Sequence, residues 1–156
     1  MHGGLSWLLI AALAGLLGLA AWLDWRSRTI SNWLNGAIAL LALPFWYANG
    51  LDPWPGVAMQ IGVAAGVLAI FALAFRFGFM GGGDVKMLAA LALWLPLGSL
   101  VQLLAIMSLA GGVVTLAVAI PHRIAKTAGK PEIPYGIAIS FAGFWLIGER
   151  ILNQFV

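Results

Sequence analysis

The chain has 156 residues, of which 63% are apolar and only 8% are charged, with a formal net charge of +3. A soluble domain carries about 25% charged residues, so this composition excludes that class and indicates an integral membrane protein. The absence of cysteine excludes disulfides and thiolate metal sites. The small positive charge is explained by topology and by contact with the lipid bilayer, so we expect no nucleic-acid partner.

Six apolar segments follow one another, and a membrane span needs about 20 apolar residues. We therefore predict a single membrane-embedded domain over residues 1–156, an all-α bundle of about six transmembrane helices. The second and fourth segments are short for a full crossing. The predicted segments are Leu5–Leu23, Trp33–Tyr47, Gly56–Phe75, Val85–Leu97, Ser99–Ile120 and Ile133–Ile147.

Polar loops separate these segments, notably Asn49–Pro55, Arg76–Gly83 and Pro121–Pro131. If the loops alternate between the two sides, only Arg150 lies on one side, and every other basic side chain lies on the opposite side. That second set is Arg26, Arg28, Arg76, Lys86, Arg123, Lys126 and Lys130. The positive-inside rule makes it cytoplasmic. We predict an inner (cytoplasmic) membrane protein with both termini on the periplasmic, extracytoplasmic side.

Two of the five acidic residues lie where an apolar segment meets the predicted cytoplasmic face. Asp24 ends the first span, and Asp84 opens the fourth. Asp84 follows glycine and has the position of a helix cap, whereas Asp24 could be an interfacial charge beside a nearby arginine. These structural interpretations stay open for each residue alone. Together, two carboxyl groups at the same depth on the same face also suit catalysis.

Paired carboxyl groups have a specific chemistry. Two that share a site hold one proton between them, because both cannot ionise at close range. One can then act as a general base on water, while its protonated partner polarises a scissile carbonyl and later donates to the leaving amine. This mechanism needs no metal and no cofactor, and we predict neither.

Three consecutive glycines, Gly81–Gly83, precede Asp84. Glycine lacks a Cβ atom and reaches positive φ cheaply, so a peptide substrate could approach the backbone closely here. A flexible loop is the alternative interpretation. Gly62 and Gly66 form a G-x-x-x-G pattern, which we expect to serve packing within the bundle, with a homodimer as the alternative.

Other protease classes find no support. The H-E-x-x-H pattern of zinc proteases and the G-x-S-x-G context of serine hydrolases are both absent.

Three stretches resemble the type IV prepilin peptidases, a family of membrane-embedded aspartic proteases. Residues 24–32 (DWRSRTISN) look like its D-x-x-x-x-x-I-P-N segment, with Ser31 in place of proline and Asn32 as the closing residue. Residues 81–86 (GGGDVK) look like G-x-G-D-x-K, and residues 134–138 (PYGIA) look like P-Y-G-x-A. Ser31 stands at a position that we interpret as a helix-start device.

The resemblance implies an endopeptidase that removes the basic leader from prepilin or pseudopilin precursors at the cytoplasmic membrane face, with Asp24 and Asp84 as the catalytic pair. The residues that it implies in substrate binding or support are Asn32, Gly81, Gly83, Lys86, Pro134, Tyr135 and Gly136. Without the cysteine-containing domain of larger members, the chain resembles the short peptidase-only type that serves tight-adherence (Flp) pili in bacteria, or related archaeal preflagellin systems. We therefore do not expect it to methylate its product.

Two functions from other classes remain open. A small cation- or proton-coupled carrier would use both acids as a relay, although carriers hold such groups near the midplane. A structural subunit of a pilus or secretion assembly would use them only as caps. Lys86 could either tune Asp84 or extend its charge to the interface.

Overall fold

The computed structural model describes residues 3–124 and 133–153, and gives no side-chain placement for residues 122 and 123. The described residues form six α-helices and no strand, which confirms the predicted all-α bundle. The helices are α1 (Gly3–Ser27), α2 (Asn32–Ala48), α3 (Ala58–Arg76), α4 (Gly82–Ala92), α5 (Leu97–Ile124) and α6 (Tyr135–Leu152). A short π-helical turn, η1 (Pro53–Val57), precedes α3.

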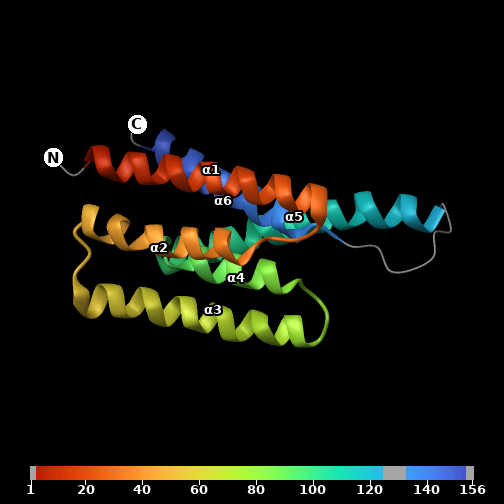
Figure 1. Cartoon of the computed structure of the whole chain (residues 1–156), viewed down its shortest axis with the longest axis horizontal. Coiled ribbons are helices and arrows are strands. Elements are labelled where there is room, and N and C mark those ends of the chain that lie inside the picture. The colour runs from red at the N-terminus through yellow and green to blue at the C-terminus, as the bar shows by residue number, and fades with distance from the viewer. Residues whose placement is uncertain (1–2, 125–132, 154–156) are drawn as a thin grey trace.

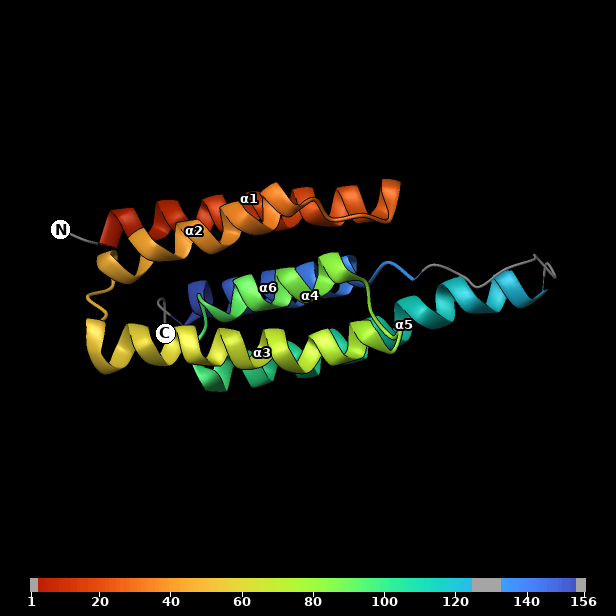
Figure 2. The ribbon, with the colours of Figure 1, turned by 60° about the horizontal axis from the view of Figure 1, so that its bottom comes forward.

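The helices form three layers of two (Figure 2). The central layer is α4 beside α6, covered on one side by α1 and α2 and on the other by α3 and α5. Helix α6 packs against α1 and α5, while α4 packs against α2 and α3. Helices α4 and α6 also contact each other, so they join the two halves of the bundle.

Several boundaries differ from the prediction. Helix α4 begins at Gly82, within the expected glycine loop, and ends at Ala92 instead of Leu97. Helix α5 continues through Pro121 to Ile124, so its last turns project beyond the other helices (Figure 1). The remainder of the predicted 121–131 loop, with Lys126 and Lys130, lies outside the described residues from position 125 onward.

Four helical segments are long and apolar enough to cross a membrane. They are Gly3–Ser27, Pro53–Arg76, Leu97–Pro121 and Tyr135–Leu152. Helices α2 and α4 have 17 and 11 residues, or about 26 and 17 Å, against a hydrocarbon core of about 30 Å. Four of the six helices are therefore long enough to cross the membrane at full length, and α2 and α4 are the short helices that the sequence predicted.

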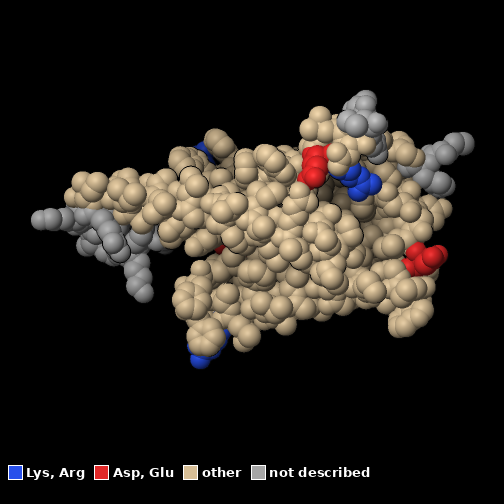
Figure 3. Space-filling view, turned by 180° about the vertical axis from the view of Figure 1, so that it is seen from behind, with Lys and Arg blue, Asp and Glu red and all other residues tan. Residues whose placement is uncertain are grey.

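The outer layer of α3 and α5 has the surface of a lipid-facing layer. Only 11% of the spanning window of Pro53–Arg76 and 17% of that of Leu97–Pro121 is buried. The charged side chains visible in Figure 3 are few, and the rest of that face is uncharged. Gly62 and Gly66 are exposed on α3, with no atom within 4 Å of an added Cβ. The expectation that their G-x-x-x-G pattern packs inside the bundle is therefore wrong.

Side chains from neighbouring helices satisfy the carboxyl end of α4. The Gln60 amide donates to the carbonyl oxygens of Leu93 at 3.2 Å and Leu95 at 2.9 Å, and the Trp46 indole donates to Leu93 at 2.8 Å. The last carbonyl groups of a helix have no partner within it, and hydrocarbon offers none. These bonds let α4 end within the bundle after three turns.

Candidate active site

Asp24 lies in the last turn of α1 but binds the start of α6. Its side chain is 4% exposed, and its Oδ2 atom accepts a hydrogen bond from the Ile137 backbone N–H at 3.2 Å. The Gly136 backbone N–H contributes a second bond. The first N–H groups of a helix lack partners within it, so an acid from elsewhere in the chain can satisfy them. Asp24 therefore caps α6 from outside that helix.

Asp84 binds the start of its own helix. It is the third residue of α4, follows Gly81 as the N-cap residue, and is 8% exposed. Its carboxyl group reaches back to the Gly81 backbone N–H, as the acidic partner of a capping box does. Asp84 is thus not the N-cap residue that the sequence suggested, although it does satisfy the helix start. Its capping role and a chemical role remain compatible.

The two carboxyl groups lie at the same end of the bundle, at the starts of α6 and α4. Helices α4 and α6 lie side by side and start at the same end of the bundle (Figure 2). The carboxyl groups of Asp24 and Asp84 are close enough for their charges to interact. Helices α1 and α4 are not a closely packed pair, so α6 and the linker after α1 bring the acids together.

Ile30 lies between the two helix starts. Helix α1 ends where Arg28 adopts a left-handed φ of 54°, and the chain then turns back toward α2. The Ile30 Cδ1 atom lies 2.6 Å from the position of a Cβ at Gly136, and its Cβ atom lies 3.1 Å from that position at Gly83. This buried side chain therefore spaces the starts of α4 and α6.

Three of the glycines have a defined steric role. A Cβ at Gly136 would lie 2.9 Å from Asp24 Oδ2, and one at Gly81 would lie 2.9 Å from Asp84 Oδ2. A Cβ at Gly83 would lie 3.1 Å from the Ile30 carbonyl oxygen. The close backbone approach at Gly83 is made by Ile30 of this chain, and a role of Gly83 toward a substrate stays a prediction. Gly81 is exposed and stays available for such an approach.

A polar group from α2 supports the start of α4. The Asn35 amide donates to the Gly83 carbonyl at 3.0 Å, and the Lys86 ammonium donates to the Asn32 side-chain oxygen at 2.7 Å. Lys86 and Asn32 are exposed, whereas Asn35 is 5% exposed. Asn35 was not predicted as a site residue. Its amide side chain inside an apolar segment is the feature that could have indicated it.

The remaining residues that the sequence singled out lie at the starts of α6 and α2. Pro134 is its N-cap residue and is fully buried. The Tyr135 ring lies beside Gly111 of α5, at 3.4 Å from the position of a Cβ there. Ser31 is the N-cap residue of α2, as expected, although its hydroxyl makes no capping bond.

A family model described as the type IV leader peptidase family matches residues 11–116. That range covers more than half of the chain and contains both Asp24 and Asp84. The chain belongs to the type IV leader peptidase family. No curated protein and no solved structure gave a significant match.

Membership of the leader peptidase family indicates a membrane protease that acts on a protein substrate. The matched range ends before Pro134, so the start of α6 is assigned to the site by its contact with Asp24 alone. Over the described residues, no group of three or more His, Cys, Asp or Glu side chains gathers into a metal site.

Proposed function

We propose that this leader peptidase is an aspartic endopeptidase that removes the basic leader from pilin-like membrane precursors, with Asp24 and Asp84 activating a water molecule. One observation carries the proposal: two buried carboxyl groups from distant parts of the chain lie at the paired starts of α4 and α6, with Ile30 packed against both starts. Burying an acid within a membrane helix bundle costs free energy, so an acid at such a position is a candidate for a functional role.

In the first step, the pair holds a single proton. The ionised carboxylate removes a proton from water, whose oxygen attacks the carbonyl carbon of the scissile bond. The protonated partner gives its proton to the carbonyl oxygen as that oxygen gains charge. The product is a tetrahedral diol, and the two carboxyl groups have exchanged their protonation states.

In the second step, the newly ionised carboxylate takes a proton from one diol hydroxyl, and the carbonyl re-forms. The other carboxyl group protonates the nitrogen as the C–N bond breaks. The leader leaves with a new carboxyl terminus and the precursor keeps a new amino terminus. The pair again holds one proton, so no covalent intermediate is needed.

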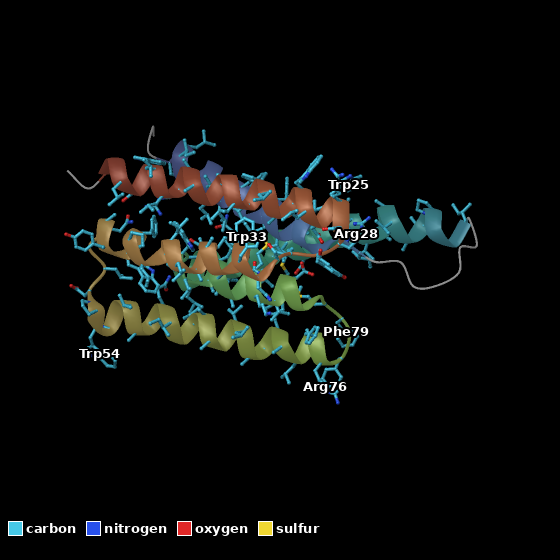
Figure 4. The ribbon with its side chains drawn as sticks, viewed as in Figure 1. Trp25, Arg28, Trp33, Trp54, Arg76 and Phe79 are labelled. Carbon is cyan, nitrogen blue, oxygen red and sulfur yellow. The ribbon has the colours of Figure 1, made fainter. Side chains whose placement is uncertain are left out.

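We place the active site on the cytoplasmic side of the inner membrane. Arg28 and Arg76 mark the end of the bundle where α4 and α6 begin, opposite Trp54 (Figure 4). The single basic residue predicted for the other side, Arg150, bonds to Asn49 at the far end of α2. The positive-inside rule then puts the acids on the cytoplasmic face, next to a precursor whose basic leader stays inside.

Cysteine labelling in intact cells tests this orientation, since the chain has no cysteine of its own. Phe79 and Trp54 are 73% and 81% exposed at opposite ends. We expect a membrane-impermeant maleimide to label Trp54→Cys and not Phe79→Cys, with both labelled after lysis. Labelling of Phe79→Cys alone in intact cells would mean that the chain has the opposite orientation in the membrane.

Co-expression with candidate precursors from the same genome tests the activity. We expect the wild-type chain to shorten a precursor on a gel, with mass spectrometry locating the new amino terminus between the basic leader and the apolar helix. The Asp24→Asn, Asp84→Asn double variant should leave the precursor intact at equal membrane levels. Asp52→Asn, a loop residue, is the matched control and should cleave normally. Equal cleavage with the double variant would disprove the proposal.

A carrier is not favoured, because it would hold its ionisable groups near the midplane. Asp24 lies in the last turn of α1, and Asp84 lies in the first turn of α4.

A further inference from the structure

Arg28 holds a positive charge beside the candidate active site. It is the first residue after α1, and its backbone N–H donates to the Asp24 carbonyl oxygen at 3.0 Å, one helical turn back. Its guanidinium group is close enough for its charge to act on the Asp24 carboxyl group. The guanidinium carbon also lies 5.8 Å from the centre of a Trp25 ring. The end of α1 therefore holds this cation on the Asp24 side of the site.

The Arg28 side chain is half-buried and incompletely bonded. Its Nη1 atom is buried without a hydrogen-bond partner, and no other basic nitrogen of the described residues is in that state. Burying a charged N–H group without an acceptor costs free energy. Arg28 also has a left-handed φ of 54°, which a residue other than glycine rarely adopts. Two unfavourable features at one residue indicate a role for its side chain beyond the fold.

The surroundings of the two acids differ. Asp24 accepts hydrogen bonds from two backbone N–H groups at the start of α6, and the Arg28 cation acts on it. Asp84 accepts one such bond, from Gly81, and the charge that acts on it is the negative charge of Asp24. Hydrogen bonds and a nearby cation both stabilise a carboxylate. When the two acids share one proton, the negative charge is therefore more stable on Asp24 and the proton on Asp84.

We propose that Arg28 is a positioning residue that keeps the negative charge of the acid pair on Asp24, which makes Asp24 the general base and Asp84 the general acid. Asp24 then takes a proton from water, the water oxygen attacks the scissile carbonyl carbon, and Asp84 gives its proton to the carbonyl oxygen. A pair that holds one proton carries one negative charge, and one guanidinium group compensates it. This inference rests on the proposed function.

The other charged and titratable groups at this end of the bundle are less well placed. Arg26 and Arg76 are exposed, so water and salt screen their charges. Lys86 is exposed and bonded to α2, and the Tyr135 ring packs against α5. Helix α2 contains no charged residue, the side chains described for α5 include none, and α6 carries its own at its other end. Arg28 is therefore the cation best placed to act on the pair.

Carboxyl-carbon NMR tests the assignment directly, because the chain has only three aspartates, Asp24, Asp52 and Asp84. The full chain is labelled with carbon-13 at the aspartate side-chain carboxyl group and titrated in detergent, and Asp→Asn variants identify each signal. We expect Asp24 to lose its proton at lower pH than Asp84. In the Asp84→Asn background, Arg28→Gln should make Asp24 take up its proton about one pH unit higher. In the Asp24→Asn background, Arg28→Gln should move the Asp84 titration by less than half as much.

Cleavage kinetics give a second measurement. Arg28→Gln should move both limbs of the bell-shaped pH profile of kcat/KM to higher pH by about one unit, because losing a cation favours the protonated form of the pair. KM should stay within about twofold. Arg28→Lys keeps the positive charge and should restore most of the wild-type profile. Arg26→Gln removes an exposed cation from the same segment and is the matched control, with the wild-type profile expected.

Other outcomes overturn the inference. An Asp84 that loses its proton before Asp24 would assign the two roles the other way. If Arg28→Gln lowers activity equally at every pH, or if Arg28→Gly cleaves like wild type, Arg28 serves only to end α1, since glycine suits its left-handed backbone. Normal cleavage with unmoved titrations would overturn this inference and leave the proposed function standing. If the wild-type chain cleaves no precursor, the proposed function fails, and the roles of base and acid fail with it.

Discussion

The two helix starts of the central layer are built alike but assembled differently. At α4, the acid belongs to the helix that it caps, and the glycines before it are its neighbours in the chain. At α6, the acid comes from α1, 113 residues before the N–H that it binds. The α4 start can therefore form locally, whereas the α6 start exists only when α1 and α6 have packed. The comparison teaches that Asp24 is the acid whose position depends on the whole fold.

Among the residues that position the two acids, the largest effect is expected at Gly136. A methyl group in Gly136→Ala would lie 2.9 Å from Asp24 Oδ2 and 2.6 Å from Ile30 Cδ1. The flexible isoleucine tip can move aside, but the carboxyl group must also shift. A displacement of about 1 Å at a reacting group costs about 100-fold in rate. Cleavage kinetics should show this fall in kcat, while Gly148→Ala, which has no atom within 4 Å of an added Cβ, should behave as wild type.

A smaller effect is expected on the α4 side, at Gly83. Its added methyl group would meet the Ile30 carbonyl oxygen at 3.1 Å, and a backbone atom cannot move as a side-chain tip does. Such overpacking costs about 1–3 kcal/mol. Gly83→Ala should lower the thermal stability in detergent as well as activity, whereas Gly136→Ala should lower mainly activity. If both variants lost only activity, the two helix starts would not differ in the way described.

Asn35 tests the support of the α4 start. Asn35→Leu keeps the size of the side chain but removes the bond to the Gly83 carbonyl. The loss of one such bond is worth about 1 kcal/mol, or roughly fivefold in kcat/KM. Asn49→Leu, at the other end of α2, is the control and should cleave normally. Equal effects of the two variants would mean that Asn35 contributes only to general stability.

Substitution of Lys86 should have the smallest effect. It also tests whether Lys86 acts on Asp84 or only extends its charge to the interface. Its ammonium group bonds to Asn32 and is exposed, so Lys86→Met should change kcat/KM by less than about threefold. The pH profile of cleavage should also be unchanged. A displaced profile would mean that Lys86 acts on Asp84 instead of joining α4 to α2.

The sequence predicted the part of the site that is local in the chain. The G-x-G-D pattern located Asp84, and the charge asymmetry located the end of the bundle where it lies. Asp24 was singled out by its place at the end of an apolar segment, but its contact with Ile137 depends on the packing of α1 against α6. Ile30 matches the isoleucine of the D-x-x-x-x-x-I-P-N segment, but its place between two helix starts depends on the packing of α4 and α6 and has no signal in the sequence.

The differences in helix boundaries have similar causes. The apolar run after Asp84 continues to Leu97, so composition could not show that α4 ends at Ala92. The end depends on Gln60 and Trp46, which come from two other helices and satisfy the last carbonyl groups. Pro121 predicted a helix end, and α5 continues for only three residues beyond it, to Ile124.

The most direct test of the account is a double-variant cycle on the two acids. Asp24→Asn and Asp84→Asn are compared singly and together for initial rates of precursor cleavage, at matched membrane levels. If the pair works as one catalytic unit, each single variant loses at least about 100-fold and the double variant loses no more than either. Partial losses that multiply in the double variant would instead identify two independent helix caps and contradict the shared chemistry.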